Sequence, residues 1–350
     1  MSAAPFRVAL SGDFKKPDGS PTFPDFDLTP LLSAPGVETA FLGPANPIAA
    51  AQLADFDALI LLMPRFAAES IHPNGRLGMV ARFGVGYDNV DTEACTKAGI
   101  ALVITPDGVR RPVAVSIITL MLALTGKLII KDRLTREGPE GFGKRVDHMG
   151  VGLVGRTLGS IGIGNIGAEL FRLAKPYDMR FIAHDPFADA KLVAELGIEL
   201  VDLESLFRRS DVLAVNCPLT AETRHLVNAE RLALMKPTAY FINTARGAIV
   251  DQKALTKALQ ERRIAGAGLD VLEQEPPAAD DPILELYNVI LAPHALCWTD
   301  QCFAGNGAAD IRAVLSVMKG EEPRGVVNRA VLSSSAWKTR LERNRQRFGH

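Results

Sequence analysis

The sequence has almost no net charge, and this excludes several classes of function. Thirty-nine Lys and Arg side chains are balanced by forty Asp and Glu side chains, which leaves a formal charge of -1 at pH 7. A chain without an excess charge of one sign has no general means of holding a polyanion or an anionic membrane. We therefore expect neither nucleic acid nor a membrane as a partner.

Cysteine is scarce, and the N-terminal region has no targeting pattern. No cysteine has Cys-x-x-Cys spacing or histidines clustered around it, so the sequence predicts packing thiols and no metal site. The segment "MSAAPFRVALSGDF" lacks a basic region followed by a long apolar one, so we expect a cytoplasmic protein without a secretory signal. The longest apolar stretch, residues 113–130, is interrupted by Ser, Thr, Gly and Lys, which predicts a buried helix rather than a membrane span. The four cysteines are Cys95, Cys217, Cys297 and Cys302.

Short β-branched runs alternate with helical patterns along most of the chain. With 350 residues, 47% of them hydrophobic, the chain can build two cores. Alternation of this kind predicts parallel sheets joined by crossover helices, that is, two doubly wound α/β domains. The strand candidates are "FRVALSG", "VETAFLG", "FDALILLMP", "LGMVARFG" and "IALVITP" in the first 110 residues, then "TLGSIGIG", "MRFIAHD", "DVLAVNCP", "AYFINTARG", "AGAGLDVL" and "NVILAPH".

The apolar helix expected from about residue 111 would carry the chain from the first domain to the second. After His294 the pattern becomes helical again, with apolar residues three and four apart in "GNGAADIRAVLSVMKGE", and we expect this helix to pack on the N-terminal domain. The predicted domains are therefore 1–112 with 299–332, which is discontinuous, and 113–298. The remaining residues, 333–350, are a tail that is basic and polar apart from Trp337 and Phe348, and we expect it to be an arm or disordered.

A glycine-rich turn follows the first strand of the second domain. Gly162, Gly164 and Gly167 have GxGxxG spacing between a strand and a helix, an arrangement that admits a pyrophosphate to the helix N-terminus. The next strand ends at Asp185, where a carboxylate can bind the adenosine ribose hydroxyls. Because a carboxylate repels a 2'-phosphate and no Arg follows Asp185 directly, the sequence favours NAD(H) over NADP(H).

Three ionisable residues follow later strands of the same predicted sheet. Arg246 lies in "FINTARGAIVD", at an edge where parallel sheets bind ligands, and an Arg there suits a substrate anion. "GLDVLEQEPP" offers two carboxylates, Glu273 and Glu275, and spacing does not choose between them. His294 ends the last strand. A cation, a carboxylate and a histidine beside a dinucleotide site suit hydride transfer to or from a 2-hydroxy acid.

Taken together, these motifs resemble the D-isomer-specific 2-hydroxyacid dehydrogenase family, which includes phosphoglycerate dehydrogenases and glyoxylate/hydroxypyruvate reductases. The resemblance covers nearly the whole chain up to about residue 332. The motifs that carry it are "ARFGVGYDNVD", "GRTLGSIGIGNIG", "NCPLTAETRHLV", "FINTARGAIVD", "GAGLDVLEQEPP" and "LAPH".

The resemblance implies a role for each ionisable residue. Arg246 would bind the substrate carboxylate and polarise its carbonyl group. Glu275, which directly precedes Pro276, would be the catalytic glutamate in place of Glu273. His294 would be the acid/base, its protonated form stabilised by Glu275.

The resemblance also implies a flavodoxin-like substrate domain and an NAD-binding Rossmann domain with a cleft between them, and a homodimer. Val85 and Gly86 would bind the substrate carboxylate through backbone N–H groups. The implied cofactor contacts, beyond the three glycines, are Asn165, Ile166, Asp185, Cys217, Pro218, Thr244, Ala245, Arg246, Asp270 and His294.

The segment after His294 departs from the family pattern. Small residues are usual there, whereas this chain reads "HALCWTD", so Trp298 is a candidate substrate contact or an interdomain packing residue. Arg65, after an N-terminal strand, is a candidate for a distal anionic group of the substrate or a solvated loop residue. The motifs do not identify the acid. Phosphite oxidation and a non-catalytic NAD-sensing role on the same fold are the alternatives.

Overall fold

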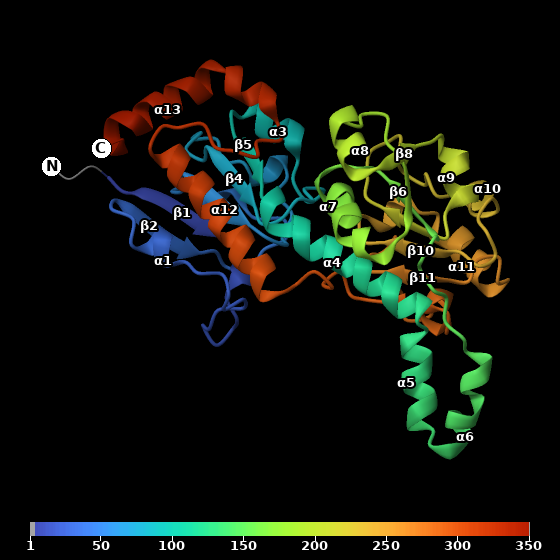
Figure 1. The fold of residues 1–350 in the computed structure, drawn as a ribbon. Helices are drawn as coiled ribbons and strands as arrows, with labels where there is room; N and C mark the ends of the chain where they lie inside the picture. The colour runs from blue at the N-terminus through green and yellow to red at the C-terminus, as the bar shows by residue number, and fades with distance from the viewer. Residues whose placement is uncertain (1–3, 350) are drawn as a thin grey trace. The chain divides into compact units, whose positions relative to one another are not determined.

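The computed structural model describes residues 4–349, which form two compact units. One unit contains the residues up to Val109 and those from Thr299 onward, and the other runs from Arg110 to Trp298. The sequence placed these divisions after residues 112 and 298. Each unit is built around a parallel sheet with helices packed against it (Figure 1). The predicted class of two doubly wound α/β domains is confirmed.

The first unit contains a five-stranded parallel sheet. Its strands are β1 (Phe6–Leu10), β2 (Val37–Phe41), β3 (Ala58–Leu61), β4 (Met79–Arg82) and β5 (Ala101–Ile104). They lie in the order β2-β1-β3-β4-β5, which is the flavodoxin-like order. The helices of this unit are α1 (Thr29–Leu32), α2 (Ala50–Leu53), α3 (Thr92–Lys97), α12 (Asp300–Met318) and α13 (Ser335–Phe348).

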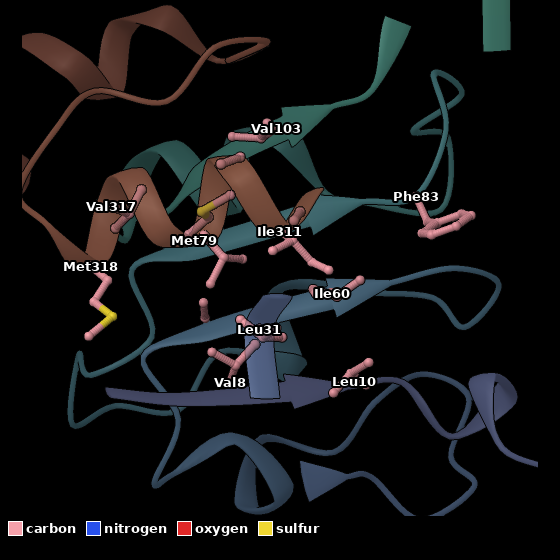
Figure 2. Close-up of a cluster of buried hydrophobic side chains, with 14 of the residues drawn as sticks. Val8, Leu10, Leu31, Ile60, Met79, Phe83, Val103, Ile311, Val317 and Met318 are labelled. Atoms are coloured by element: carbon pink, nitrogen blue, oxygen red, sulfur yellow. The ribbon is translucent and has the colours of Figure 1, made fainter. Parts of the chain in front are cut away.

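Helix α12 packs on this sheet, as its apolar spacing predicts. Ile311 and Val317 are buried in one cluster with Val8, Ile60 and Met79, which come from β1, β3 and β4 (Figure 2). Neighbouring residues of the same strands face a second buried cluster on the other side of the sheet. Burial on both faces explains why these strands are continuously apolar and do not alternate with polar residues.

One charged side chain of α12 is buried in this core. Asp310 is 0% exposed, and neither of its carboxylate oxygens has a hydrogen-bond partner among residues 4–349. Burial raises the pKa of Asp310 well above its ordinary value, although the positive charge of Arg82 acts in the opposite direction. The carboxyl group therefore holds its proton far more strongly than an exposed aspartate does.

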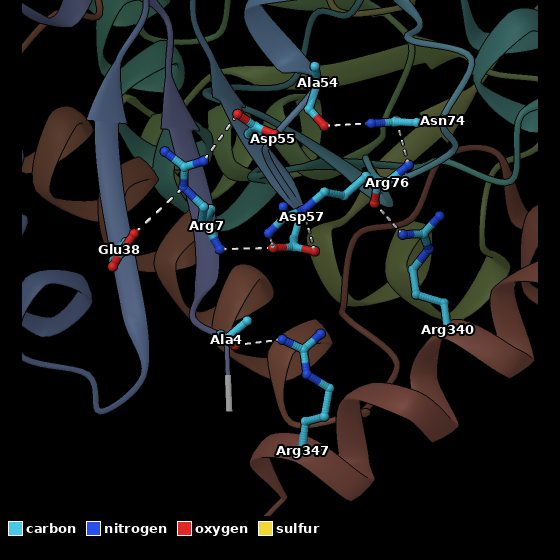
Figure 3. A network of polar contacts seen from close by, with 10 residues as sticks. All are labelled: Ala4, Arg7, Glu38, Ala54, Asp55, Asp57, Asn74, Arg76, Arg340 and Arg347. Atoms are coloured by element: carbon cyan, nitrogen blue, oxygen red, sulfur yellow. Dashed lines mark hydrogen bonds and ion pairs between the residues drawn. The ribbon is translucent and has the colours of Figure 1, made fainter. Parts of the chain in front are cut away.

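The expectation that residues 333–350 form an arm or are disordered is wrong for the described part of this tail. Helix α13 buries Trp337, which is 1% exposed, in the core of the first unit. Arg340 donates to the carbonyl oxygens of Gly75 and Arg76. Figure 3 shows the contact of Arg340 with Arg76 and the bond from Arg347 to the carbonyl oxygen of Ala4. The basic composition of the tail hid an apolar stripe at helical spacing, formed by Trp337, Leu341 and Phe348.

The second unit contains a seven-stranded parallel sheet. Its strands are β6 (Thr157–Ile161), β7 (Arg180–His184), β8 (Ile198–Leu200), β9 (Val212–Val215), β10 (Tyr240–Asn243), β11 (Gly266–Leu269) and β12 (Val289–Leu291). They lie in the order β12-β11-β10-β9-β6-β7-β8. From the neighbouring strands β6 and β9, successive strands are added outward on opposite sides, so the strand order, but not the strand direction, changes between β6 and β9, as in dinucleotide-binding folds. Sequence analysis missed β8, because this three-residue edge strand has two exposed residues and no apolar run.

The helices of the second unit include one long apolar helix and a projecting pair. Helix α4, which starts in the first unit, is the one helix in residues 4–349 that is long and apolar enough to cross a membrane by length and composition; 56% of its most apolar window is buried within the protein. Helices α5 and α6 extend away from the sheet of this unit (Figure 1). The helices are α4 (Pro106–Thr125), α5 (Leu128–Arg136), α6 (Pro139–Gly143), α7 (Asn165–Ala174), α8 (Ala190–Leu196), α9 (Leu203–Arg209), α10 (Ala229–Leu232) and α11 (Gln252–Gln260).

Candidate active site

The candidate residues of the second unit follow the ends of six of its seven strands. Because all neighbouring strands are parallel, these ends lie along one edge of the sheet, where open α/β sheets bind ligands. In chain order, the candidates are the glycine turn after β6, Asp185 after β7, Cys217 and Pro218 after β9, Thr244 to Arg246 after β10, Asp270 and Glu275 after β11, and His294 after β12.

Two of the turn glycines allow backbone segments to approach each other closely. Gly162 has a φ of +93°, and a Cβ there would lie 3.0 Å from the carbonyl oxygen of Asn216. A Cβ on Gly167 would lie 2.5 Å from the carbonyl oxygen of Gly162. Side chains at either position would therefore push the turn away from β9 or from the first turn of α7.

The third glycine leaves the N-terminus of α7 accessible. Gly164 is the N-cap residue and makes no side-chain capping bond, and a Cβ built on it would have no atom within 4 Å. Asn165 and Ile166 are the first two residues of the helix. The N–H groups of a first helical turn have no intrahelical acceptor and attract anions, so this end of α7 suits a phosphate.

Asp185 lies next to the glycine turn, and each of its carboxylate oxygens accepts a hydrogen bond from a backbone N–H group. Oδ2 accepts a hydrogen bond from Ile163 N at 2.8 Å, and Oδ1 accepts one from Phe187 N at 2.8 Å. The carboxylate is therefore fixed in place next to the turn, with further lone pairs left to accept from a ligand.

His294 and Glu275 form a hydrogen-bonded pair. His294 Nδ1 lies 2.8 Å from Glu275 Oε2, and the other oxygen of Glu275 accepts from the backbone N–H of Leu272 at 2.9 Å. Burial favours the neutral form of Glu275, but the hydrogen bonds from His294 and Leu272, together with the positive charges of His294 and Arg246, outweigh it and lower the pKa of Glu275. An ionised carboxylate only accepts hydrogen bonds, so Nδ1 of His294 carries a proton and Nε2 is the ring nitrogen that this pair does not use.

Asp270 fixes the backbone after His294. Its Oδ1 accepts hydrogen bonds from Ala295 N at 3.0 Å and Leu296 N at 3.1 Å. Burial raises the pKa of Asp270, although these two N–H groups and the charge of His294 act against the shift. Although Ala295 and Leu296 depart from the family pattern, their backbone N–H groups still donate to Asp270 and so orient the segment after His294.

Arg246 follows a turn that is closed by an amide side chain. Asn243 Nδ2 donates to Arg246 O at 2.9 Å, and Asn243 Oδ1 accepts from Ala245 N at 3.0 Å. Arg246 Nη1 donates to Ala245 O at 2.7 Å. Thr244 Oγ1 is buried and has no hydrogen-bond partner among residues 4–349. Sequence analysis missed Asn243, whose signal was its place as the last, buried residue of an otherwise apolar strand.

Cys217 and Pro218 follow β9 next to the glycine turn. Burial raises the pKa of Cys217 to about 11, so its thiol stays protonated at neutral pH. This agrees with the interpretation of Cys217 as a packing residue rather than a nucleophile.

Val85 and Gly86 lie in the first unit, at the carboxyl edge of its sheet after β4. The preceding residue, Gly84, is held by Thr105, whose buried Oγ1 accepts from Gly84 N at 2.8 Å and donates to Asn306 Oδ1 at 2.8 Å. Sequence analysis missed this support, because Thr105 and Asn306 are 201 residues apart in the chain.

The remaining candidates lie one in each unit. Arg65 is exposed after β3, and its backbone N–H donates to Asn46 Oδ1 at 2.8 Å. Trp298 is 44% exposed, and its backbone N–H donates to Ala295 O at 2.9 Å. Substrate contacts by these two residues stay predictions.

Comparisons with known proteins identify the family. The model for the D-isomer specific 2-hydroxyacid dehydrogenase, NAD binding domain, matches residues 118–295. A glyoxylate reductase of Korarchaeum cryptofilum is 40% identical over 291 residues, covering 83% of this chain and 88% of that protein. The chain belongs to the D-isomer specific 2-hydroxyacid dehydrogenase family. The resemblance inferred from the motifs is confirmed, and with it an oxidoreductase that uses a nicotinamide dinucleotide.

Two further relatives of this family extend the likeness. A D-3-phosphoglycerate dehydrogenase of Methanocaldococcus jannaschii is 37% identical over 79% of this chain and 52% of that protein. The crystal structure of a glyoxylate reductase from Paecilomyes thermophila superposes with a TM-score of 0.79 at 27% identity, covering 92% of this chain and 98% of that one.

The residues at the carboxyl edge fit a dinucleotide. The N-terminus of α7, which has no side-chain cap, suits the pyrophosphate, and Asp185 suits the adenosine ribose. The buried hydroxyl group of Thr244 has no hydrogen-bond partner among residues 4–349 and could form a hydrogen bond with a ligand. These three features stand after β6, β7 and β10, so they follow the same sheet edge as the His294–Glu275 pair.

Proposed function

We propose that this 2-hydroxyacid dehydrogenase interconverts a small 2-oxo acid and its D-2-hydroxy acid, with His294 as acid/base, Glu275 orienting it and Arg246 binding the carboxylate and the carbonyl oxygen. The observation that carries the proposal is the 2.8 Å pair between His294 Nδ1 and Glu275 Oε2 at the carboxyl edge of a dinucleotide-binding sheet. The relative named glyoxylate reductase makes glyoxylate the first substrate to test.

The protonation of His294 sets the direction of proton transfer. When bound, a nicotinamide dinucleotide would supply the hydride that reduces the carbonyl carbon of the substrate. His294 gives the proton on Nε2 to the carbonyl oxygen, becomes neutral and regains a proton from solvent. Glu275 stays ionised, holds Nδ1–H and stabilises the protonated ring before transfer. Arg246 attracts the substrate carboxylate and the negative charge that develops on the oxygen.

We propose NAD(H) as the preferred cofactor. Asp185 is fixed beside the glycine turn by the N–H groups of Ile163 and Phe187, so its negative charge stays where the adenosine ribose would bind. A 2'-phosphate there would meet a carboxylate, and residues 186–190 contain no Lys or Arg to offset it.

We also propose a homodimer, because the projecting helices of the second unit present apolar side chains to solvent. Leu128 and Ile129 at the start of α5 are 59% and 44% exposed, and Phe142 of α6 is 56% exposed. Val115 and Leu122 of α4 are 46% and 40% exposed. Exposed apolar groups at this density suit a protein interface. Sedimentation or light scattering at micromolar concentration would show a dimer, and a monomer would contradict this assignment.

A cytoplasmic location is our proposal from the thiols. None of the four cysteines forms a disulfide, and Cys95 and Cys302 are buried. Buried thiols outside disulfides are typical of proteins in a reducing compartment. Fractionation of the source cells with an antibody to the protein tests the assignment.

The experiment that tests the function is the oxidation of NADH with a panel of 2-oxo acids, from glyoxylate and hydroxypyruvate to branched and aromatic acids. Turnover that is lost in His294→Ala supports the proposal. If no 2-oxo acid is reduced while NADH still binds, the proposal fails. Phosphite oxidation with NAD is then the next assay, and a non-catalytic NAD sensor remains if phosphite is inert too.

A further inference from the structure

A second histidine–glutamate pair lies beside the first and has no role in the proposed reaction. His225 Nε2 and Glu273 Oε1 are 2.5 Å apart. The side chains are 44% and 33% exposed, so the contact is short although solvent reaches both partners. With Glu273 ionised and able only to accept, Nε2 of His225 is the donor.

This pair joins two loops that serve different parts of the site. His225 lies in the loop between β9 and α10 that also contains Cys217 and Pro218, and Glu273 lies two residues before Glu275 in the loop after β11. The cofactor-side loop is closed on itself, since Thr223 Oγ1 donates to Pro218 O at 2.7 Å. The Cys217–Pro218 end of this loop is therefore held by a hydrogen bond that does not depend on the His225 side chain.

Glu273 is also fixed from the Arg246 side. Its backbone N–H donates to Gln252 Oε1 at 2.8 Å, and its Oε2 accepts from Gln252 N at 3.3 Å. Gly247, the residue after Arg246, lies so close to the backbone of Leu272 and Glu273 that a Cβ there would clash with both. The Arg246 segment and the Glu273 segment are thus packed directly against each other.

Backbone bonds place His225 on the same packed region. Its N–H donates to Ala248 O at 3.0 Å, and the next bond runs from Val227 N to Ile249 O at 3.0 Å. His225 has a φ of +51°, a left-handed conformation that is unfavourable for a non-glycine residue and is kept only where surrounding contacts fix it. The side chain of His225 is therefore presented to Glu273 by a constrained backbone.

These contacts of His225 and Glu273 bear on the position of Glu275. Its Oε1 is held by the N–H of Leu272, the residue before Glu273, while its Oε2 holds His294. We propose that His225 and Glu273 are positioning residues, which lock the Leu272–Glu275 loop so that Glu275 keeps His294 in line for proton transfer. This inference rests on the proposed function and assigns no contact with substrate to either residue.

The test compares two replacements of His225 with the substrate found in the panel. His225→Leu removes the donor, and we expect kcat to fall about 10-fold with little change in NADH affinity, as for residues that orient an active-site group from behind. His225→Gln places an amide N–H near the position of Nε2 and should recover most of the loss. A deuterium isotope effect measured with NADH deuterated at the transferred position should rise in His225→Leu, because hydride transfer becomes slower relative to product release.

Two further variants separate the possible outcomes. Arg209→Gln breaks an exposed ion pair with Glu199 at β8, the opposite edge of the sheet from β12, and should leave kcat unchanged. In the double variant of His225→Leu with Glu273→Leu, the losses should not add, because the two residues act through one contact. The proposal is overturned if His225→Leu, folded as judged by circular dichroism, has the kcat of the parent, or if His225→Gln is as slow as His225→Leu. His294→Ala assayed alongside shows whether the proposed function itself has failed, because only then does that variant stay active.

Discussion

Glu275 contacts His294 with one carboxylate oxygen and the backbone of its own loop with the other. The bond from Leu272 N fixes the Glu275 carboxylate in place, and this carboxylate accepts a hydrogen bond from Nδ1 of His294. The second nitrogen of the ring, Nε2, takes no part in this contact, and under the proposed function it is the one that faces the substrate.

Replacing His294 with alanine should lower kcat for 2-oxo acid reduction about 100-fold or more at neutral pH, because the proton donor is removed while Arg246 is kept. NADH binding, followed by fluorescence titration, should persist, since the glycine turn and Asp185 are untouched. Near-parent turnover in a folded His294→Ala protein would show that another group delivers the proton.

Replacing Asp185 with alanine should reduce the preference for NADH over NADPH, measured as the ratio of the two kcat/KM values. The variant removes the negative charge that opposes a 2'-phosphate, and it also releases Ile163 N and Phe187 N. Asp185→Asn is the matched control, because it keeps an acceptor for a backbone N–H. An unchanged ratio in both variants would place cofactor discrimination elsewhere.

Replacing Asp310 with asparagine should make the protein relatively more stable as the pH rises. The folded-state pKa of Asp310 is raised, so the folded form binds this proton more tightly than the unfolded form, and the parent loses stability as pH increases above the ordinary value of 3.8. The loss attributable to this group is about 1.4 kcal/mol per pH unit until the folded-state pKa is reached. Urea denaturation of both proteins at several pH values from 4 upward should show their difference widening. A constant difference would mean that Asp310 titrates alike in both states.

Replacing Trp337 with alanine should lower the free energy of unfolding by about 3–5 kcal/mol, because a fully buried indole leaves a cavity in the first unit. Phe187→Ala is the control, since that ring is 93% exposed and its loss should change stability by about 0.5 kcal/mol or less. Thermal and urea unfolding measure both. Equal stability of the two variants would show that α13 contributes little to the core.

The sequence predicted those features that depend on local patterns. GxGxxG followed by Asp185, continuous apolar strands and the order of the ionisable residues each lie within a short segment, so spacing alone identifies the cofactor edge. The choice between Glu273 and Glu275 was not available from spacing, because both follow β11 closely. The structure separates them by partner, His225 for Glu273 and His294 for Glu275.

The contacts that sequence analysis missed are long-range. Asn328 Oδ1 accepts a hydrogen bond from Leu102 N, which is 226 residues away in the chain, and Thr105 Oγ1 donates one to Asn306 Oδ1, 201 residues away. Neither pairing leaves a trace in hydrophobic periodicity. The tail was misjudged for a different reason, because its positive charge dominates its composition while a few large apolar residues decide its fold.

The burial of Trp337 has a consequence for how the chain is made. The second unit is one continuous stretch from Arg110 to Trp298, whereas the first takes β1 to β5 from the start of the chain and α12 and α13 from its end. During synthesis, the ribosome releases the whole second unit before the helices that complete the core of the first. The cluster on one face of this sheet therefore stays incomplete until translation has passed α12 and α13, whereas the buried cluster on the other face is built from residues 9–102. Of the two units, the one that emerges first is therefore the last to be completed.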